Sequence, residues 1–175
     1  ILVGIFALLS ALDQNSDYIV EKKIWKIYHQ QLDIAKDPNV IPDKSFERVI
    51  SGYKNIIGKY PNSRLTPGLY IRVGEMYVLK EDYDAAHKIF YKIIELYPNN
   101  KEISAEALFK VGKIYEITNN WPEASKVYTD IIQNYPLTET GLSTPIYIAN
   151  YFKNQNEFQS TMDAYESAIR HYTGI

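Results

Sequence analysis

Two stretches of sequence decide the fold, IRVGEMYVLKEDYDAAHKIFYKIIELYP at residues 71–98 and FKVGKIYEITNNWPEASKVYTDIIQNYP at residues 109–136. Their apolar and aromatic residues fall at the same places, and each stretch ends in Tyr-Pro. Tyr60-Pro61 ends an earlier copy, so the marker tyrosines Tyr60, Tyr97 and Tyr135 recur every 37 or 38 residues, and one further step reaches Tyr172. A repeat of this length is typical of a stack of small structural units.

Each copy contains the pattern of two helices. An aromatic residue lies seven positions before every marker tyrosine and another lies fourteen before it, which places both on one stripe of a helix. In an earlier segment an aromatic residue recurs twenty positions before the marker, and Gly74, Gly112 and Ala149 recur twenty-three before it. Glycine is unfavourable inside a helix, so its recurrence predicts a close approach between two helix backbones.

The sequence therefore predicts four helix pairs in residues 17–175, with units at about residues 17–62, 66–99, 103–137 and 141–175. Short polar stretches separate the helices within a unit, and the Tyr-Pro pairs end the units, because proline cannot continue a helix.

The composition excludes several classes of function. Lys and Arg number 19 against 21 Asp and Glu, and the two signs are interspersed, which argues against a nucleic-acid partner and against a polybasic membrane patch. The chain has no cysteine, no phosphate-binding loop and no nucleophile elbow, and its three histidines are far apart and outside any metal motif. We therefore expect no catalytic residues, no cofactor and no metal site.

Residues 1–16 form a separate segment, because Ile1–Leu12 carries no charge. A spanning helix needs about 20 apolar residues, so this run is too short to cross a bilayer. It is either the remnant of an export signal or anchor, which would associate the chain with a membrane through residues 1–12 or sequence upstream, or a helix packed on a partner. Leu9-Ser10-Ala11 is similar to the run before a lipoprotein cysteine, but Leu12 stands in the cysteine's place.

The helix-pair pattern resembles the tetratricopeptide repeat (TPR) family. The residues on which this resemblance rests are Val73-Gly74, Tyr77, Ala86, Phe90 and Pro98 in one unit, and Val111-Gly112, Tyr115, Ala124, Tyr128 and Pro136 in the next. The resemblance covers residue 44 to the end and residues 17–36 more loosely, although the units exceed the family's usual 34 residues. It implies an all-α, right-handed superhelical solenoid of about four TPR-like helix pairs.

The long unit ending in Tyr-Pro is similar to one branch of that family. This branch contains bacterial envelope proteins such as the outer-membrane barrel-assembly lipoprotein and the periplasmic coordinator of the Tol-Pal system. The resemblance implies a non-catalytic scaffold that binds other proteins in a multi-subunit complex, in the periplasm or anchored to a membrane facing it. The alternative is a soluble cytoplasmic TPR adaptor or co-chaperone that binds peptide segments.

By analogy with the family, the first helix of each unit would line a concave binding face. The candidate partner-binding residues are then Ile71, Arg72, Glu75, Phe109, Lys110, Lys113, Ile146 and Asn150. They suggest a mildly apolar groove with polar flanks, suited to an extended segment or a helix. The alternative for the apolar members is that they pack on the neighbouring unit.

Overall fold

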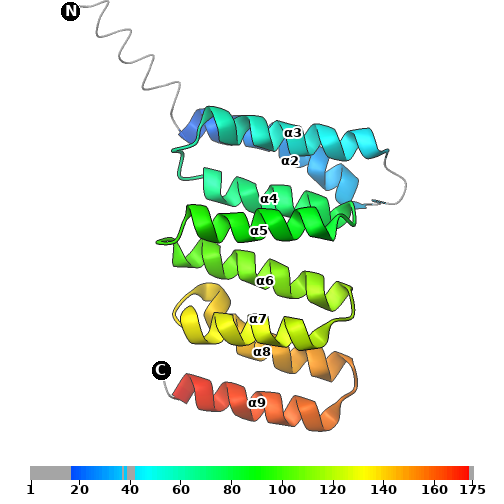
Figure 1. Cartoon of the computed structure of the whole chain (residues 1–175), viewed down its shortest axis with the longest axis vertical. Coiled ribbons are helices and arrows are strands. Elements are labelled where there is room, and N and C mark those ends of the chain that lie inside the picture. The colour runs from blue at the N-terminus through cyan, green and yellow to red at the C-terminus, as the bar shows by residue number, and fades with distance from the viewer. Residues whose placement is uncertain (1–16, 37, 39–41, 174–175) are drawn as a thin grey trace, which may run out of the picture. The chain divides into compact units, whose positions relative to one another are not determined.

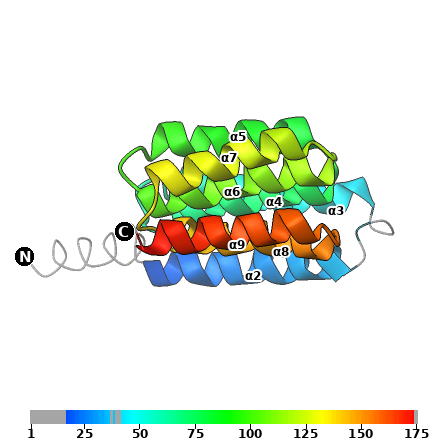
Figure 2. The same ribbon diagram turned by 90° about the horizontal axis from the view of Figure 1, so that it is seen from below.

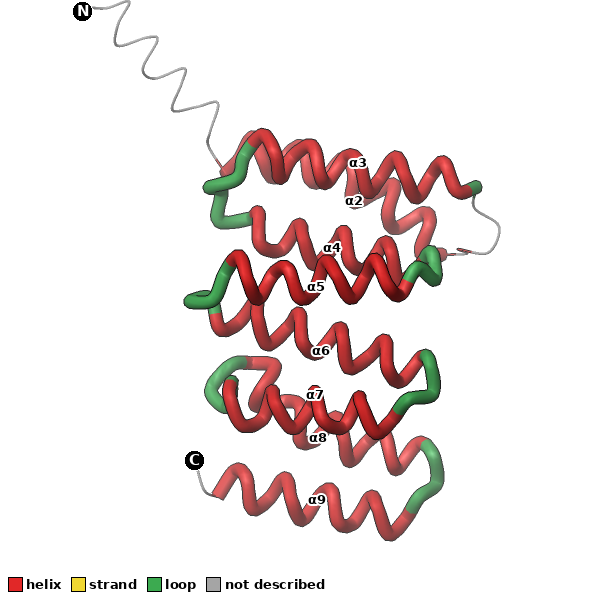
Figure 3. The backbone as a smooth tube through the Cα atoms, in the orientation of Figure 1, coloured by secondary structure: helices red, strands yellow, loops and turns green. Residues whose placement is uncertain are grey.

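The computed structural model describes residues 17–36, 38 and 42–173, and every regular element within these residues is helical (Figure 3). The predicted all-α helical-repeat fold is therefore confirmed. The predictions for residues 1–16 lie outside this range. The chain divides into two compact units, residues 1–93 and 94–175. No helix among the described residues is both long enough and apolar enough to cross a membrane.

The first unit contains α2 (Asp17–Lys36), α3 (Asp43–Lys59), α4 (Thr66–Leu79) and most of α5 (Tyr83–Leu96) (Figure 1). α3 packs against both α2 and α4. One face of α3 supplies half of the buried residues of this core, as its seven-residue aromatic spacing predicts. They include Phe46, Val49, Ile50, Tyr53, Ile56 and Ile57.

The second unit contains α6 (Lys101–Ile117), α7 (Trp121–Asn134), α8 (Glu139–Asn154) and α9 (Phe158–Thr173). α6 packs against α7, α8 against α9, and α8 also contacts α6 and α7 (Figures 1 and 2). Its core is formed by buried residues of α6 and α7, namely Ala105, Leu108, Ala124, Tyr128 and Ile131. The stacked rings of Trp121 and Tyr151, with centroids 3.8 Å apart, join α7 to α8.

The repeated glycines receive an aromatic ring from the second helix of their own pair. A Cβ added to Gly74 would lie 2.5 Å from Cζ of Phe90, and one added to Gly112 would lie 2.7 Å from Cζ of Tyr128. Both rings are fully buried. The sequence predicts that two helix backbones approach each other at these glycines. The group that lies on the glycine backbone is instead an aromatic ring of the second helix.

The turn inside three of the helix pairs has one recurrent geometry. Glu81, Asn119 and Asn156 have φ of 61°, 57° and 59°, the left-handed region that ends a helix. In each turn the following amide donates to the carbonyl five residues earlier, from Asp82 to Tyr77 in the α4–α5 turn. This is the Schellman arrangement, and it ends each first helix at the same repeat position.

Candidate partner-binding surface

Of the candidate residues on α4, Ile71 is buried and Arg72 contacts another helix of the first unit. Ile71 is only 4 % exposed, so its side chain cannot form a binding surface as it stands. The guanidinium of Arg72 lies 4.5 Å from the ring centroid of Tyr28 on α2, a cation–π contact. Glu75 is half-buried on the same helix. For Ile71, the burial agrees with the packing alternative and not with the groove.

Phe109 and Lys113, two candidate residues on α6, contact α8 through Tyr147, which was not among the candidates. The ring of Phe109 lies edge-on to that of Tyr147, with centroids 4.8 Å apart and an interplanar angle of 74°. Phe109 also contacts the buried ring of Tyr128 at 5.4 Å. Such tilted and edge-to-face pairs are the favoured geometry of aromatic side chains. Phe109 and Tyr147 are both half-buried, so part of each ring faces solvent.

Beside these rings lies a polar group of four side chains, here named the Glu116 cluster and made up of Lys113, Glu116, Tyr128 and Tyr147. The Tyr128 hydroxyl donates to Oε1 of Glu116 at 2.5 Å, and the Tyr147 hydroxyl lies 2.8 Å from both carboxylate oxygens. Nζ of Lys113 donates to Oε2 of Glu116 at 3.0 Å and to the Tyr147 hydroxyl at 2.5 Å. The Glu116 side chain is 10 % exposed and that of Lys113 is 40 % exposed.

The electrostatics of the cluster follow from burial around one carboxylate. Burial raises the pKa of Tyr128, and its hydrogen bond to Glu116 raises it further. The pKa of Tyr147 is raised mainly by burial as well. Burial alone would lower the pKa of Lys113, but hydrogen bonds to Tyr147 and Glu116 outweigh it and the pKa is raised. At neutral pH the hydroxyls stay protonated and the ammonium stays charged.

The cluster therefore fixes one cation at the edge of an aromatic surface. An ammonium group has three N–H donors, and Glu116 and Tyr147 accept two of those of Lys113. The third donor, on a side chain that is partly exposed, can reach a carbonyl or carboxylate oxygen of a bound molecule. Because Glu116 balances the ammonium charge, the surface favours a polar acceptor beside an apolar group more than a strongly anionic ligand.

The remaining candidates lie on the same two helices. Ile146 of α8 is 40 % exposed. Asn150, one turn further along, accepts a hydrogen bond from the Tyr165 hydroxyl at 3.1 Å and is exposed. Lys110 is half-buried on α6. The residues Phe109, Lys113, Tyr147, Ile146 and Asn150 are named the α6/α8 surface below.

Sequence reasoning missed Tyr147 of the α6/α8 surface and also Glu116, which holds Lys113 in place. Tyr147 occupies the repeat position of Arg72 and Lys110. Comparing the units therefore shows only that the last unit has a tyrosine where two earlier units have a cationic side chain. Glu116 lies one turn after Lys113, and that spacing is the one available signal of an ion pair. Among the residues that the structure describes, no group of three His, Cys, Asp or Glu side chains could hold a metal ion.

The comparisons with known proteins agree with this architecture. Residues 106–138, most of the α6–α7 pair, match the family model described as tetratricopeptide repeat. No curated protein matches the chain. Among solved structures, the chain is similar to BtubC (BKLC) from P. vanneervenii, with a TM-score of 0.55 and 13 % sequence identity over 89 % of this chain and 74 % of that one. Identity this low shows the fold alone.

Tetratricopeptide repeats generally mediate protein–protein interaction and are generally non-catalytic scaffolds. Neither comparison supports the particular envelope proteins named above over other members of the family. Residues 106–138 match the tetratricopeptide repeat family, within a chain whose described residues have the helical-repeat fold.

Proposed function

We propose that this chain is a non-catalytic scaffold that binds a segment of another protein on the α6/α8 surface. The observation that carries the proposal is the pair of partly exposed rings, Phe109 and Tyr147, beside an ammonium that Glu116 holds in place. Aromatic side chains bury much area with little loss of conformational freedom, and a positioned donor selects the orientation of the bound backbone.

The partner segment is an apolar stretch with a polar acceptor next to it. Phe109, Tyr147 and Ile146 offer apolar area, whereas Lys113 and Asn150 offer hydrogen-bonding groups at its border. A helix or an extended strand of a partner presents such alternating groups along one face. Peptide-binding surfaces of this kind combine a few anchors with weakly contributing neighbours.

We also propose that the partner belongs to a bacterial cell-envelope complex, in the periplasm or at a membrane facing it. The support is the uncharged run of Ile1–Leu12 and the long repeat unit ending in Tyr-Pro, as in the envelope branch of the family. A cytoplasmic peptide-binding adaptor is the alternative that the test below separates from it.

The test is a capture experiment with the whole chain from native membranes and, separately, from cytosol. Ile146→Glu places a charge on the exposed edge of the α6/α8 surface without opening the core. Leu137→Glu, at a position 74 % exposed outside this surface, is the matched control. We expect a partner recovered with wild type and Leu137→Glu to be lost with Ile146→Glu.

Two results would contradict different parts of the proposal. Equal recovery with both variants would remove the α6/α8 surface as the binding site. Recovery of the Ile146-dependent partner only from cytosol would place the protein with the adaptors and remove the envelope assignment. A photo-crosslinking side chain at position 146 would then identify which residues of the partner lie against α8.

A further inference from the structure

The outer face of α2 carries three large exposed side chains in one row. Tyr18, Trp25 and Leu32 are 70 %, 64 % and 40 % exposed, and their seven-residue spacing places them along one stripe of the helix. The ring of His29 lies against that of Trp25, with centroids 4.0 Å apart and the ring planes tilted by 47°. We name Tyr18, Trp25 and Leu32 the α2 stripe. Three exposed large residues in a row on one helix call for an explanation beyond chance exposure.

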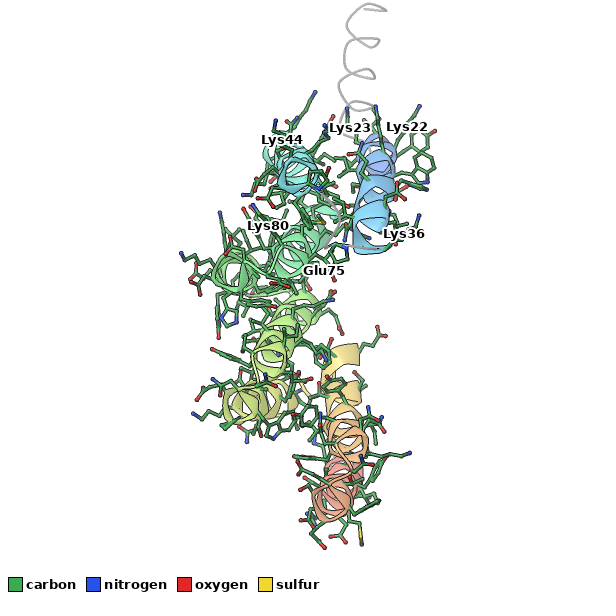
Figure 4. All side chains as sticks on the ribbon, turned by 90° about the vertical axis from the view of Figure 1, so that its right-hand side faces the viewer. Lys22, Lys23, Lys36, Lys44, Glu75 and Lys80 are labelled. Atoms are coloured by element: carbon green, nitrogen blue, oxygen red, sulfur yellow. The ribbon has the colours of Figure 1, made fainter. Side chains whose placement is uncertain are left out.

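Lys22 and Lys26 border the stripe, and their charges are not cancelled. Each carboxylate of α2 has a cation nearby: Asp17 lies 2.6 Å from Arg64, Glu21 lies 3.9 Å from Arg64, and Asp33 lies 2.8 Å from Lys36. By contrast, the ion pairs of the described residues include none for Lys22, Lys23 and Lys26. Lys22 and Lys23 lie toward the N-terminal end of α2 in Figure 4.

The charge of the chain is also unevenly distributed, which its net value of -2 conceals. Residues 17–93 hold thirteen Lys and Arg against ten Asp and Glu, whereas residues 94–175 hold six against ten. The helices of the first unit are thus basic, and those of the second unit are acidic. An anionic surface would attract the part of the chain that carries the α2 stripe.

The pattern fits a lipid surface better than a second helix. A helix pairing along this stripe would also need apolar residues three or four positions after each member of the row. Those positions hold Glu21 and Lys22 after Tyr18, and Ala35 and Lys36 after Leu32. Three positions after Trp25 lies Tyr28. It is aromatic, but it is half-buried and its ring contacts the guanidinium of Arg72. Tyr, Trp and Lys side by side are typical of helices lying in the membrane–water interface.

We propose that α2 lies along an anionic membrane surface, with the α2 stripe entering the interface and Lys22 and Lys26 facing the lipid headgroups. The inference draws on the membrane location proposed above, with Ile1–Leu12 as the tether, but is independent of the α6/α8 surface. If Ile1–Leu12 enters a bilayer, the five Cα–Cα steps from Leu12 to Asp17 can hold Asp17 no more than about 18 Å away. The folded helix would then be within reach of the headgroups.

The test is binding of the whole chain to vesicles, read from Trp25. Trp121→Phe leaves Trp25 as the one tryptophan, because the sequence has two. We expect its emission to shift to the blue with vesicles of phosphatidylcholine and phosphatidylglycerol, and to be quenched by brominated lipid. With phosphatidylcholine alone the shift should be much smaller, since the lysines then gain no headgroup charge.

Two sets of substitutions then measure the contributions of the α2 stripe and of the lysines beside it. Tyr18→Ser, Trp25→Ser and Leu32→Ser together should weaken vesicle partitioning, followed by flotation, at least about tenfold. Lys22→Gln and Lys26→Gln together should weaken it about thirtyfold on anionic vesicles. The matched control removes three equally exposed residues of the second unit, Leu137→Ser, Phe158→Ser and Met162→Ser, and should leave partitioning unchanged.

The outcomes separate the inference from the proposed tether. If wild type binds vesicles and the stripe variant binds equally well, the tether holds and the inference fails. If wild type does not bind anionic vesicles at all, both fail, while capture of a partner by the α6/α8 surface is unaffected. If the stripe variant loses capture of a protein and not of vesicles, α2 binds a protein and the lipid assignment is wrong. Circular dichroism confirms that each variant keeps its helices.

Discussion

Adding one methyl group to two different glycines should change the free energy of unfolding in opposite directions. Gly112→Ala places a Cβ 2.7 Å from Cζ and 3.1 Å from Cδ1 of Tyr128. That ring is fully buried, and its hydroxyl is held by Glu116, so it has little room to move. Gly58→Ala, near the end of α3, places a Cβ with no atom within 4 Å.

The magnitudes follow from two opposing effects. Alanine is favoured over glycine inside a helix by about 1 kcal/mol, and this gain applies at both positions. Forcing an extra methyl group into a packed core costs about 1–3 kcal/mol, and this cost applies only at Gly112. We expect Gly58→Ala to stabilise the protein by up to about 1 kcal/mol and Gly112→Ala to destabilise it by about 1–2 kcal/mol.

Urea unfolding followed by circular dichroism at the helical band measures both effects. The chain has two compact units, and Trp121 lies in the second. The unfolding transition that is also seen in Trp121 fluorescence is therefore that of the second unit. A further variant, Tyr128→Leu, removes the ring, and in that background Gly112→Ala should lose most of its cost. The reasoning is refuted if Gly112→Ala raises the free energy of unfolding as much as Gly58→Ala does.

Two more perturbations test local features of the fold. Glu81→Asn should stabilise the protein by about 0.5 kcal/mol, because Glu81 has a left-handed φ of 61° that asparagine tolerates better, and an unchanged urea midpoint would contradict this. Burial raises the pKa of Tyr53 to about 12, whereas the unfolded chain releases that proton at about pH 10, so stability is complete below about pH 10 and falls as the pH rises to about 12. Tyr53→Phe should lessen this alkaline loss in urea midpoints measured across the range, and an identical pH profile for the variant would show that Tyr53 is not its source.

The helices could be predicted from sequence because the same residue types recur at the same positions in several units. The aromatic residues seven positions before the marker tyrosines include Tyr53, Phe90 and Tyr128, and all three are fully buried. The small residue of the first helix was also recognisable, although the ring that fills the space above it was not. A pattern shows that a position must be small, whereas only coordinates show which neighbouring group approaches it.

The candidate surface was less predictable, because its key contacts break the repeat. Ile71 and Phe109 occupy the same repeat position, yet Ile71 is buried and Phe109 reaches the surface. Tyr147 stands where the other units have a cation, and its hydroxyl joins Glu116 and Lys113 into one cluster. Residues that differ between copies carry no periodic signal, and the α2 stripe lies in the unit that departs most from the pattern.

The rings that lie over Gly74 and Gly112 have a consequence for how such a chain can grow. In both cases the glycine and its ring belong to the same helix pair, and Gly74 and Phe90 lie 16 positions apart, as do Gly112 and Tyr128. A duplication that copies a whole pair brings its own closed core and can be inserted at a Tyr-Pro boundary. A recombination point inside a pair that changes this spacing separates a glycine from its ring and leaves a cavity, so gene rearrangements that survive should keep the 16 positions between them.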